Sequence, residues 1–186
     1  MKKLFLLSII AIFAIGNVNA QQVKFGAKAG VNFASVSGDD ADDIDGKTSF
    51  HVGGVANIGI SDKLAIQPEV VYSSQGFTSN EDGSDVEGTL NYINIPVLID
   101  FEIAQGLSLQ AGPQVGINIK KELDIDGQVF DLDAEDFDYG AALGLEYQME
   151  SGLFFQARYT LGFADFLKDS DAKNNVLSFS LGYFFL

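Results

Sequence analysis

Residues 23–33 read VKFGAKAGVNF, and apolar and polar side chains alternate strictly along this stretch. One set is Val, Phe, Ala, Ala, Val and Phe, and the other is Lys, Gly, Lys, Gly and Asn. A period of two is typical of a β-strand whose two faces meet different surroundings. The stretch is about twice as long as an ordinary strand of a soluble protein.

The same alternation recurs in seven further segments. It is strong in 107–119 and 137–147 and weaker in 50–60, 64–72, 90–101, 153–161 and 176–185. None of them has a helical period, so the sequence predicts an all-β fold. The alternation changes phase near Tyr92, which predicts a β-bulge there. Pro68 and Pro113 fall inside predicted strands, and we expect bulges to accommodate them.

The connections between these segments alternate in length. Short connections span 61–63, 102–106 and 148–152, whereas the long ones span 34–49, 73–89, 120–136 and 162–175. Short turns at one end and long loops at the other are typical of outer-membrane barrels with an even number of strands. The sequence therefore predicts an eight-stranded antiparallel up-and-down transmembrane β-barrel.

The glycines decide which face of each strand is turned inward. A soluble lipocalin-like carrier is the alternative to a membrane barrel, with an apolar interior and a polar exterior. Glycine would only weaken a strand on a water-facing surface, but inside a narrow barrel it relieves crowding. We therefore expect an apolar face toward lipid and a lumen lined by polar residues and by Gly26, Gly30, Gly53, Gly59, Gly112, Gly116, Gly140 and Gly144.

The first 20 residues predict export. Lys2 and Lys3 precede an apolar run and a V-N-A ending, the pattern of a cleaved signal peptide at 1–20. Residues 21–186 would then form the barrel domain in the outer membrane of a Gram-negative cell, with both termini periplasmic. Cysteine is absent, which excludes disulfides, and a formal net charge of −15 argues against nucleic-acid binding.

Several segments resemble the PorT-like outer-membrane β-barrel family. The resemblance is carried by LAIQPEVVYSSQGF (64–77), YINIPVLIDF (92–101), LSLQAGPQVG (107–116), FDYGAALGLEY (137–147), ARYTLG (157–162) and NVLSFSLGYFF (175–185). It implies a small barrel and, for some members, a role as an accessory of a protein-secretion or transport apparatus. Barrels of this kind commonly end on an aromatic residue, whereas Leu186 follows Phe185 here. We expect contacts with outer-membrane lipid and with the barrel assembly machinery.

Polar residues at inward positions are the candidates for a lumen site. An eight-stranded barrel is just wide enough for its own side chains, so we expect these residues to fill the interior as an ion-paired network. Arg158 is predicted to lie between Glu69 and Glu146. A conducting pore is the alternative interpretation. The predicted lumen set is Lys24, Lys28, His51, Glu69, Glu146, Gln156 and Arg158.

His51 is the single histidine and the first suspect for catalysis. If the turn at 61–63 is centred on Asp62, His51 and Ser73 become cross-strand neighbours. Such a pair could act as base and nucleophile in a rim enzyme, but no third member is evident. We therefore predict that the protein is not an enzyme and needs no cofactor.

Most acidic residues lie in the four long connections, beginning with GDDADDIDG at 38–46. With periplasmic termini these loops face outward, where they could meet a surface protein partner or divalent cations. The spacing of Glu122, Asp124, Asp126 and Asp133 imitates a calcium-binding loop. A hairpin turning at Asp126 and Gly127 is the favoured alternative. The sequence thus predicts a structural or surface-interaction barrel with acidic extracellular loops.

Overall fold

The computed structural model describes residues 23–37, 45–81, 84–125, 127–131, 134–165 and 173–185. The predicted signal peptide and most of the first acidic loop lie outside these residues. Within them no helix is long and apolar enough to cross a membrane. The strands are β1 (Val23–Ser37), β2 (Asp45–Gly46), β3 (Thr48–Ser61), β4 (Leu64–Glu81), β5 (Ser84–Ala104), β6 (Leu107–Ile125), β7 (Gln128–Asp131), β8 (Phe137–Gln148), β9 (Leu153–Asp165) and β10 (Lys173–Phe185).

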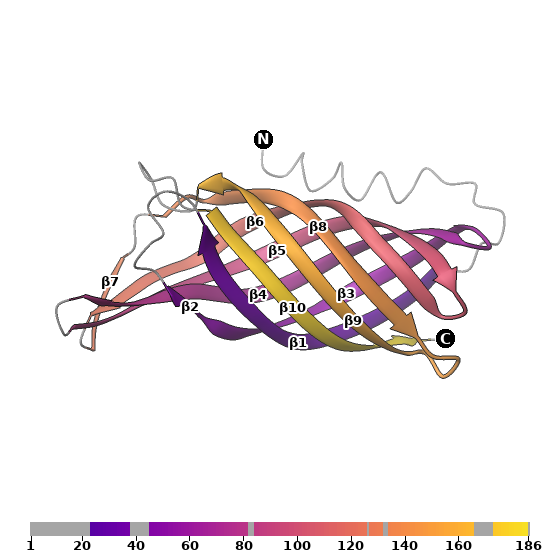
Figure 1. The fold of residues 1–186 in the computed structure, drawn as a ribbon, viewed down its shortest axis with the longest axis horizontal. Helices are drawn as coiled ribbons and strands as arrows, with labels where there is room; N and C mark the ends of the chain where they lie inside the picture. Colours follow the sequence, from indigo (N-terminus) through magenta and orange to yellow (C-terminus); the bar gives the residue numbers. More distant parts are fainter. Residues whose placement is uncertain are drawn as a thin grey trace.

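Eight of these strands pair into a closed ring, and Figure 1 shows the resulting barrel from the side. Each pairs antiparallel with the strands before and after it, and β1 pairs with β10 to close the barrel. The remaining two, β2 and β7, are short strands attached to β4 and β6. The predicted eight-stranded antiparallel barrel is confirmed.

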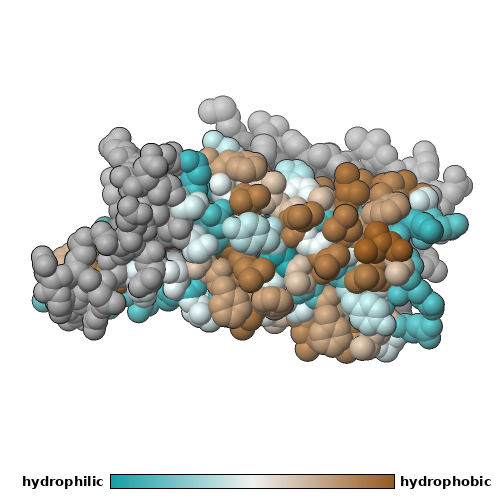
Figure 2. All heavy atoms as spheres, viewed as in Figure 1, coloured by the Kyte–Doolittle hydropathy of each residue, from teal (hydrophilic) through white to brown (hydrophobic). Residues whose placement is uncertain are grey.

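The apolar set of each strand faces outward. Phe25 is 61% exposed, and Val23, Val31 and Phe33 on the same face are also exposed, whereas Lys28 between them is buried in the lumen. In Figure 2 the brown side chains spread over the ring strands, with hydrophilic residues at the end that carries the short turns. A polar interior behind an apolar exterior is the pattern of a membrane barrel and excludes the lipocalin-like carrier.

Two of the predicted long loops are largely strand. The β4–β5 ladder runs without interruption from Ser73↔Tyr92 to Glu81↔Ser84, so 73–89 is a long hairpin rather than a loop. Likewise β6 continues to Ile125 and pairs with β7. We call this side of the barrel the hairpin end and the opposite side the short-turn end. Alternation did not predict these extensions, because the two faces of a strand outside the lipid need not differ in polarity.

The hairpin extensions form one sheet that rises from the ring. β2 pairs with β4 at Phe77 and Thr78, the extended parts of β4 and β5 pair with each other, and β5, β6 and β7 continue the sheet. Figure 1 shows these extensions at the left, beyond the crossing strands of the barrel. We refer to β2, β7 and the parts of β4, β5 and β6 at 74–81, 84–91 and 119–125 as the protruding sheet.

The strand irregularities match the sequence only in part. The β5–β6 register shifts between Asn91 and Tyr92, which confirms the predicted bulge. The bulges expected at Pro68 and Pro113 were wrong, because the ladders keep their register through both residues. Proline removes one donor but does not add a residue, so the loss of local pairing is enough to accommodate it.

Two phenylalanines point into the lumen near the short-turn end. Phe154 and Phe184 are fully buried with ring centroids 4.6 Å apart, and they pack with Val55. Each faces a glycine on the neighbouring strand: Phe154 pairs with Gly182 and Phe184 with Gly26. A Cβ at position 182 would lie 2.1 Å from the Phe154 ring. These glycines therefore provide room for aromatic rings, a use that the sequence did not reveal.

Candidate functional site

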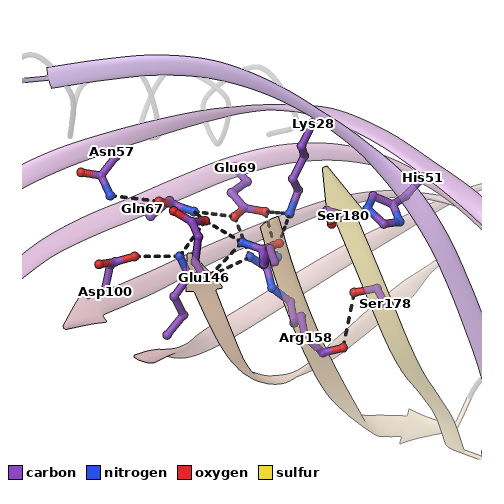
Figure 3. A network of polar contacts seen from close by, with 12 residues as sticks. Lys28, His51, Asn57, Gln67, Glu69, Asp100, Glu146, Arg158, Ser178 and Ser180 are labelled. Atoms are coloured by element: carbon purple, nitrogen blue, oxygen red, sulfur yellow. Dashed lines mark hydrogen bonds and ion pairs between the residues drawn. The ribbon is translucent and has the colours of Figure 1, made fainter. Parts of the chain in front are cut away.

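Glu69 on β4 is the centre of a buried network across the lumen (Figure 3). Its carboxylate accepts hydrogen bonds from both terminal nitrogens of Arg158, at 2.8 and 2.6 Å. Lys28 Nζ lies 2.7 Å from the same carboxylate, and all three side chains are at least nine-tenths buried. A carboxylate held by a bidentate arginine and a lysine is a strong charge-assisted arrangement.

Three glutamine side chains extend this network around Glu146. The amide groups of Gln67, Gln110 and Gln156 each donate to Glu146 Oε2, at 3.1, 3.0 and 3.0 Å. Gln110 also donates to Asp100 Oδ2 at 2.7 Å. Among the described residues, no lysine or arginine makes an ion pair with Glu146 or Asp100. The glutamine amides therefore supply the hydrogen-bond donors to these two buried carboxylates.

The predicted role of Arg158 needs correction. Arg158 pairs with Glu69 instead of bridging the two glutamates, and the link between them is the Gln67 amide, which donates to both at 3.1 Å. Lys24 lies apart from this centre, with its ammonium 3.4 Å from Gln148 Oε1. Gln67 and Gln110 were absent from the predicted set. The signal that the sequence offers for them is their inward position in the alternation.

The network lies between two cavities of different size. At the short-turn end a cavity of about 560 Å³ is bordered by Lys24, Asp100 and Glu146, among others. Toward the hairpin end a cavity of about 30 Å³ is bordered by Lys28, His51 and Arg158. The smaller one has room for about a water molecule or two. The buried network therefore separates the large cavity at the short-turn end from a nearly filled part of the lumen toward the hairpin end, which we call the upper lumen.

His51 is paired in register with Ser73, as the turn at Asp62 predicted. The two side chains do not form a catalytic pair, however. His51 Nδ1 lies 2.8 Å from Asn32 Oδ1, and Nε2 lies 2.8 Å from Ser180 Oγ. Asn32 uses its amide nitrogen for Ser73 Oγ, at 2.9 Å. Because Asn32 turns its oxygen to the ring, Nδ1 carries the proton and Nε2 accepts from Ser180.

The environment of His51 explains this arrangement as lumen structure. His51, Asn32 and Ser180 are all more than nine-tenths buried. The adjoining cavity of about 30 Å³ is too small for an acyl substrate. Gly30 allows the ring to fit, because a Cβ there would lie 2.7 Å from His51 Cε1. What the side chains form is a fixed hydrogen-bonded chain across three strands.

The candidate calcium residues lie in the protruding sheet or outside the described residues. Glu122 Oε2 is 2.7 Å from Lys120 Nζ, and Asp124 Oδ1 accepts from Gly127 N at 2.8 Å. Asp126 and Asp133 are outside the part of the chain that the structure describes. The β6–β7 ladder and the positive φ of Gly127 confirm the predicted hairpin. In the described ranges no three His, Cys, Asp or Glu residues are grouped as metal ligands.

A family model for the outer membrane protein beta-barrel domain matches residues 19–168. This range contains most of the ring and every residue of the Glu69 and Glu146 network described above. The chain belongs to this family. Its members are outer-membrane barrels, so the family places the protein in the outer membrane of Gram-negative cells. No curated protein matches the sequence significantly.

Solved structures agree with this family assignment at the level of the fold. Neisserial surface protein A is 16% identical with a TM-score of 0.64, over 89% of this chain and 100% of that one. Ail, the attachment invasion locus protein of Yersinia pestis, was solved in complex with the heparin analogue sucrose octasulfate. It is 16% identical with a TM-score of 0.54, over 88% of this chain and 99% of Ail. Identities this low establish the shared barrel alone.

Proposed function

We propose that the protein is a closed outer-membrane barrel that holds an acidic protruding sheet outside the cell for contact with a cationic partner. The observation that carries the proposal is the continuous β4–β5 ladder, which extends beyond the ring to Glu81↔Ser84. With cleavage of residues 1–20 and periplasmic termini, this sheet faces the medium. Extended strands keep binding groups at fixed positions, whereas a flexible loop would lose entropy on binding.

The lumen supports a scaffold role rather than a channel. The Glu69 carboxylate is inaccessible to solvent and binds Arg158 and Lys28, while the glutamine amides occupy the space beside it. Eight-stranded barrels are narrow enough for side chains to fill them. Filling of the lumen by this network leaves the exposed surface of the protruding sheet as the part available for function.

Charge indicates the class of partner. Glu87, Glu122, Asp124 and Asp131 lie on one face of the protruding sheet, because their strand positions are paired across β5, β6 and β7. Lys47 and Lys120 neutralise two of them. The formal net charge of the chain is −15, so a sulfated polyanion such as the one bound by Ail would be repelled. A basic surface of another protein is the expected partner.

The test uses outer-membrane vesicles, in which the outer side faces the medium. We expect immobilised polylysine to retain vesicles carrying the protein more strongly than heparin does, with retention falling at high salt. Replacing Glu122, Asp124 and Asp131 with Gln or Asn should reduce retention. Replacing Asp62 and Glu150 at the short-turn end should not. Heparin binding, or loss of retention from the short-turn variant, would contradict the proposed charge or orientation.

The PorT-like assignment stays a prediction drawn from sequence resemblance. An accessory role in secretion would require a stable complex with other envelope proteins. Cross-linking in intact outer membranes followed by identification of the captured proteins tests this alternative: reproducible capture of secretion components would support it, and capture of assembly machinery alone would count against it.

A further inference from the structure

The upper lumen contains polar atoms that have no hydrogen-bond partner within the described chain. Asn94 Oδ1, Asn118 Nδ2 and Asp138 Oδ1 are buried and unpaired. The Glu146 carboxylate, which lies closer to the short-turn end, is different because it accepts hydrogen bonds from three amide groups. A buried donor or acceptor without a partner destabilises the folded state, so such atoms call for an explanation.

Two of these residues, Asn94 and Asp138, flank Gly116. Asn94 on β5 and Asp138 on β8 are the cross-strand partners of Gly116 on its two sides. Two pairs further along, and on the same face, Tyr92 is opposite Asn118. A Cβ on Gly116 would lie 2.7 Å from Asn94 Oδ1, 3.3 Å from Asp138 Cβ and 3.4 Å from Tyr92 Cδ1. Because position 116 has no side chain, the space over this backbone is bordered by Asn94 Oδ1 on one side and by the Asp138 side chain on the other.

The chemistry of this group points to a cation. Asn94 is 6% exposed and borders the cavity of about 30 Å³ toward the hairpin end, which has room for about a water molecule or two. The ion pairs among the described residues use Glu69, Glu87, Glu122 and Asp136, and Asp138 is not among those carboxylates. Carboxylate and amide oxygens together with water are the ligands that calcium prefers.

We propose that Asn94 and Asp138 bind a calcium ion over Gly116, with water completing the coordination. The Asn118 amide would donate to a bound water or to the second carboxylate oxygen, the outer-shell role that orients metal ligands. The site is separate from the acidic hairpin of Glu122 and Asp124, and it does not depend on the proposed surface interaction. Its effect would be to tie β5, β6 and β8 together where the ring passes into the protruding sheet.

Tyr92 makes the site directly observable. Terbium replaces calcium at oxygen sites and emits when a nearby tyrosine is excited, and the Tyr92 ring borders the Gly116 position. We would titrate terbium into the refolded barrel, compete it with calcium, and measure the calcium-dependent rise in melting temperature separately. The Tyr92→Phe variant should lose most of the emission while keeping the calcium-induced stabilisation.

Two substitutions should change the metal affinity in opposite directions. Asp138→Asn should weaken terbium binding by at least about tenfold, because it removes the charged ligand. Asn94→Asp adds a second carboxylate, so calcium affinity should rise by about tenfold while the calcium-free barrel becomes less stable. Asp100→Asn is the matched control, since Asp100 is a buried lumen carboxylate near the short-turn end, bound by Gln110. It should leave the emission unchanged.

Unaltered emission and unaltered calcium response in Asp138→Asn would overturn the proposal and assign water to these atoms. If Asp138→Asn fails to fold, Asn94→Asp decides the matter: destabilisation without a stronger calcium response would overturn the proposal equally. If neutralising Glu122 and Asp124 abolishes the terbium emission, the metal binds at the hairpin, and the Gly116 site is rejected as well.

Discussion

Replacing Glu69 with Gln tests whether the buried network stabilises the barrel. The substitution keeps the shape of the side chain but removes the charge that binds Arg158 and Lys28. Glu69 has no solvent-accessible side-chain surface, and its two cationic partners are 5% and 3% exposed. Both cations would therefore be left in the lumen without a counter-charge.

The magnitude follows from this burial. Breaking a buried ion pair by removing one partner costs about 3 to 5 kcal/mol, because the remaining charge stays desolvated. Glutamine can still accept one hydrogen bond from Arg158, while Lys28 keeps its 2.7 Å bond to Gln156. We expect Glu69→Gln to lower the free energy of unfolding by about 3 to 5 kcal/mol. Combining it with Lys28→Met should cost less than the sum of the single variants.

Unfolding by urea in lipid vesicles is the assay, followed by the mobility of folded and unfolded barrel on gels. The chain contains no tryptophan, so fluorescence of that residue cannot report the transition. Glu87→Gln is the matched control, since Lys47 lies 2.6 Å from Glu87, a carboxylate that is 54% exposed. An exposed pair is worth about 0 to 1 kcal/mol. Equal losses from the two variants would refute the argument that burial determines the cost.

Two further predictions concern packing and lipid contact. Gly182→Ala should destabilise the barrel by about 1 to 3 kcal/mol, because its Cβ would meet the Phe154 ring, and Phe154→Leu should restore part of the loss. Gly54→Ala is the control and should be close to neutral, because its Cβ would lie 3.9 Å from the Gly26 carbonyl oxygen. Equal unfolding free energies for the two glycine variants would reject this explanation. Leu143→Arg in the middle of β8 should cost about 2 to 4 kcal/mol in vesicles if that face meets lipid. Val129→Arg on β7 has similar exposure but should cost little, and the reverse order would place the membrane at the hairpins.

The sequence predicted the barrel because strand periodicity is a local property. Alternation in 23–33 is enough to show which side chains share a face, and the glycines among the polar residues show which face is inward. The turn at Asp62 even gave the pairing of His51 with Ser73. The extents of β4, β5 and β6 were less predictable, since beyond the membrane the two faces of a strand no longer meet different solvents.

Residue type and alternation placed Lys28, Glu69 and Arg158 in the lumen, but they could not say which carboxylate each cation would bind. Arg158 and Glu69 are 89 positions apart, and their contact depends on the closure of the ring, which brings β4 and β9 face to face across the interior. The same closure made Gln67 the link between Glu69 and Glu146. Local periodicity therefore determined the faces of the strands, whereas partners across the lumen were decided by the tertiary structure, because inward side chains reach groups on strands that are not their neighbours.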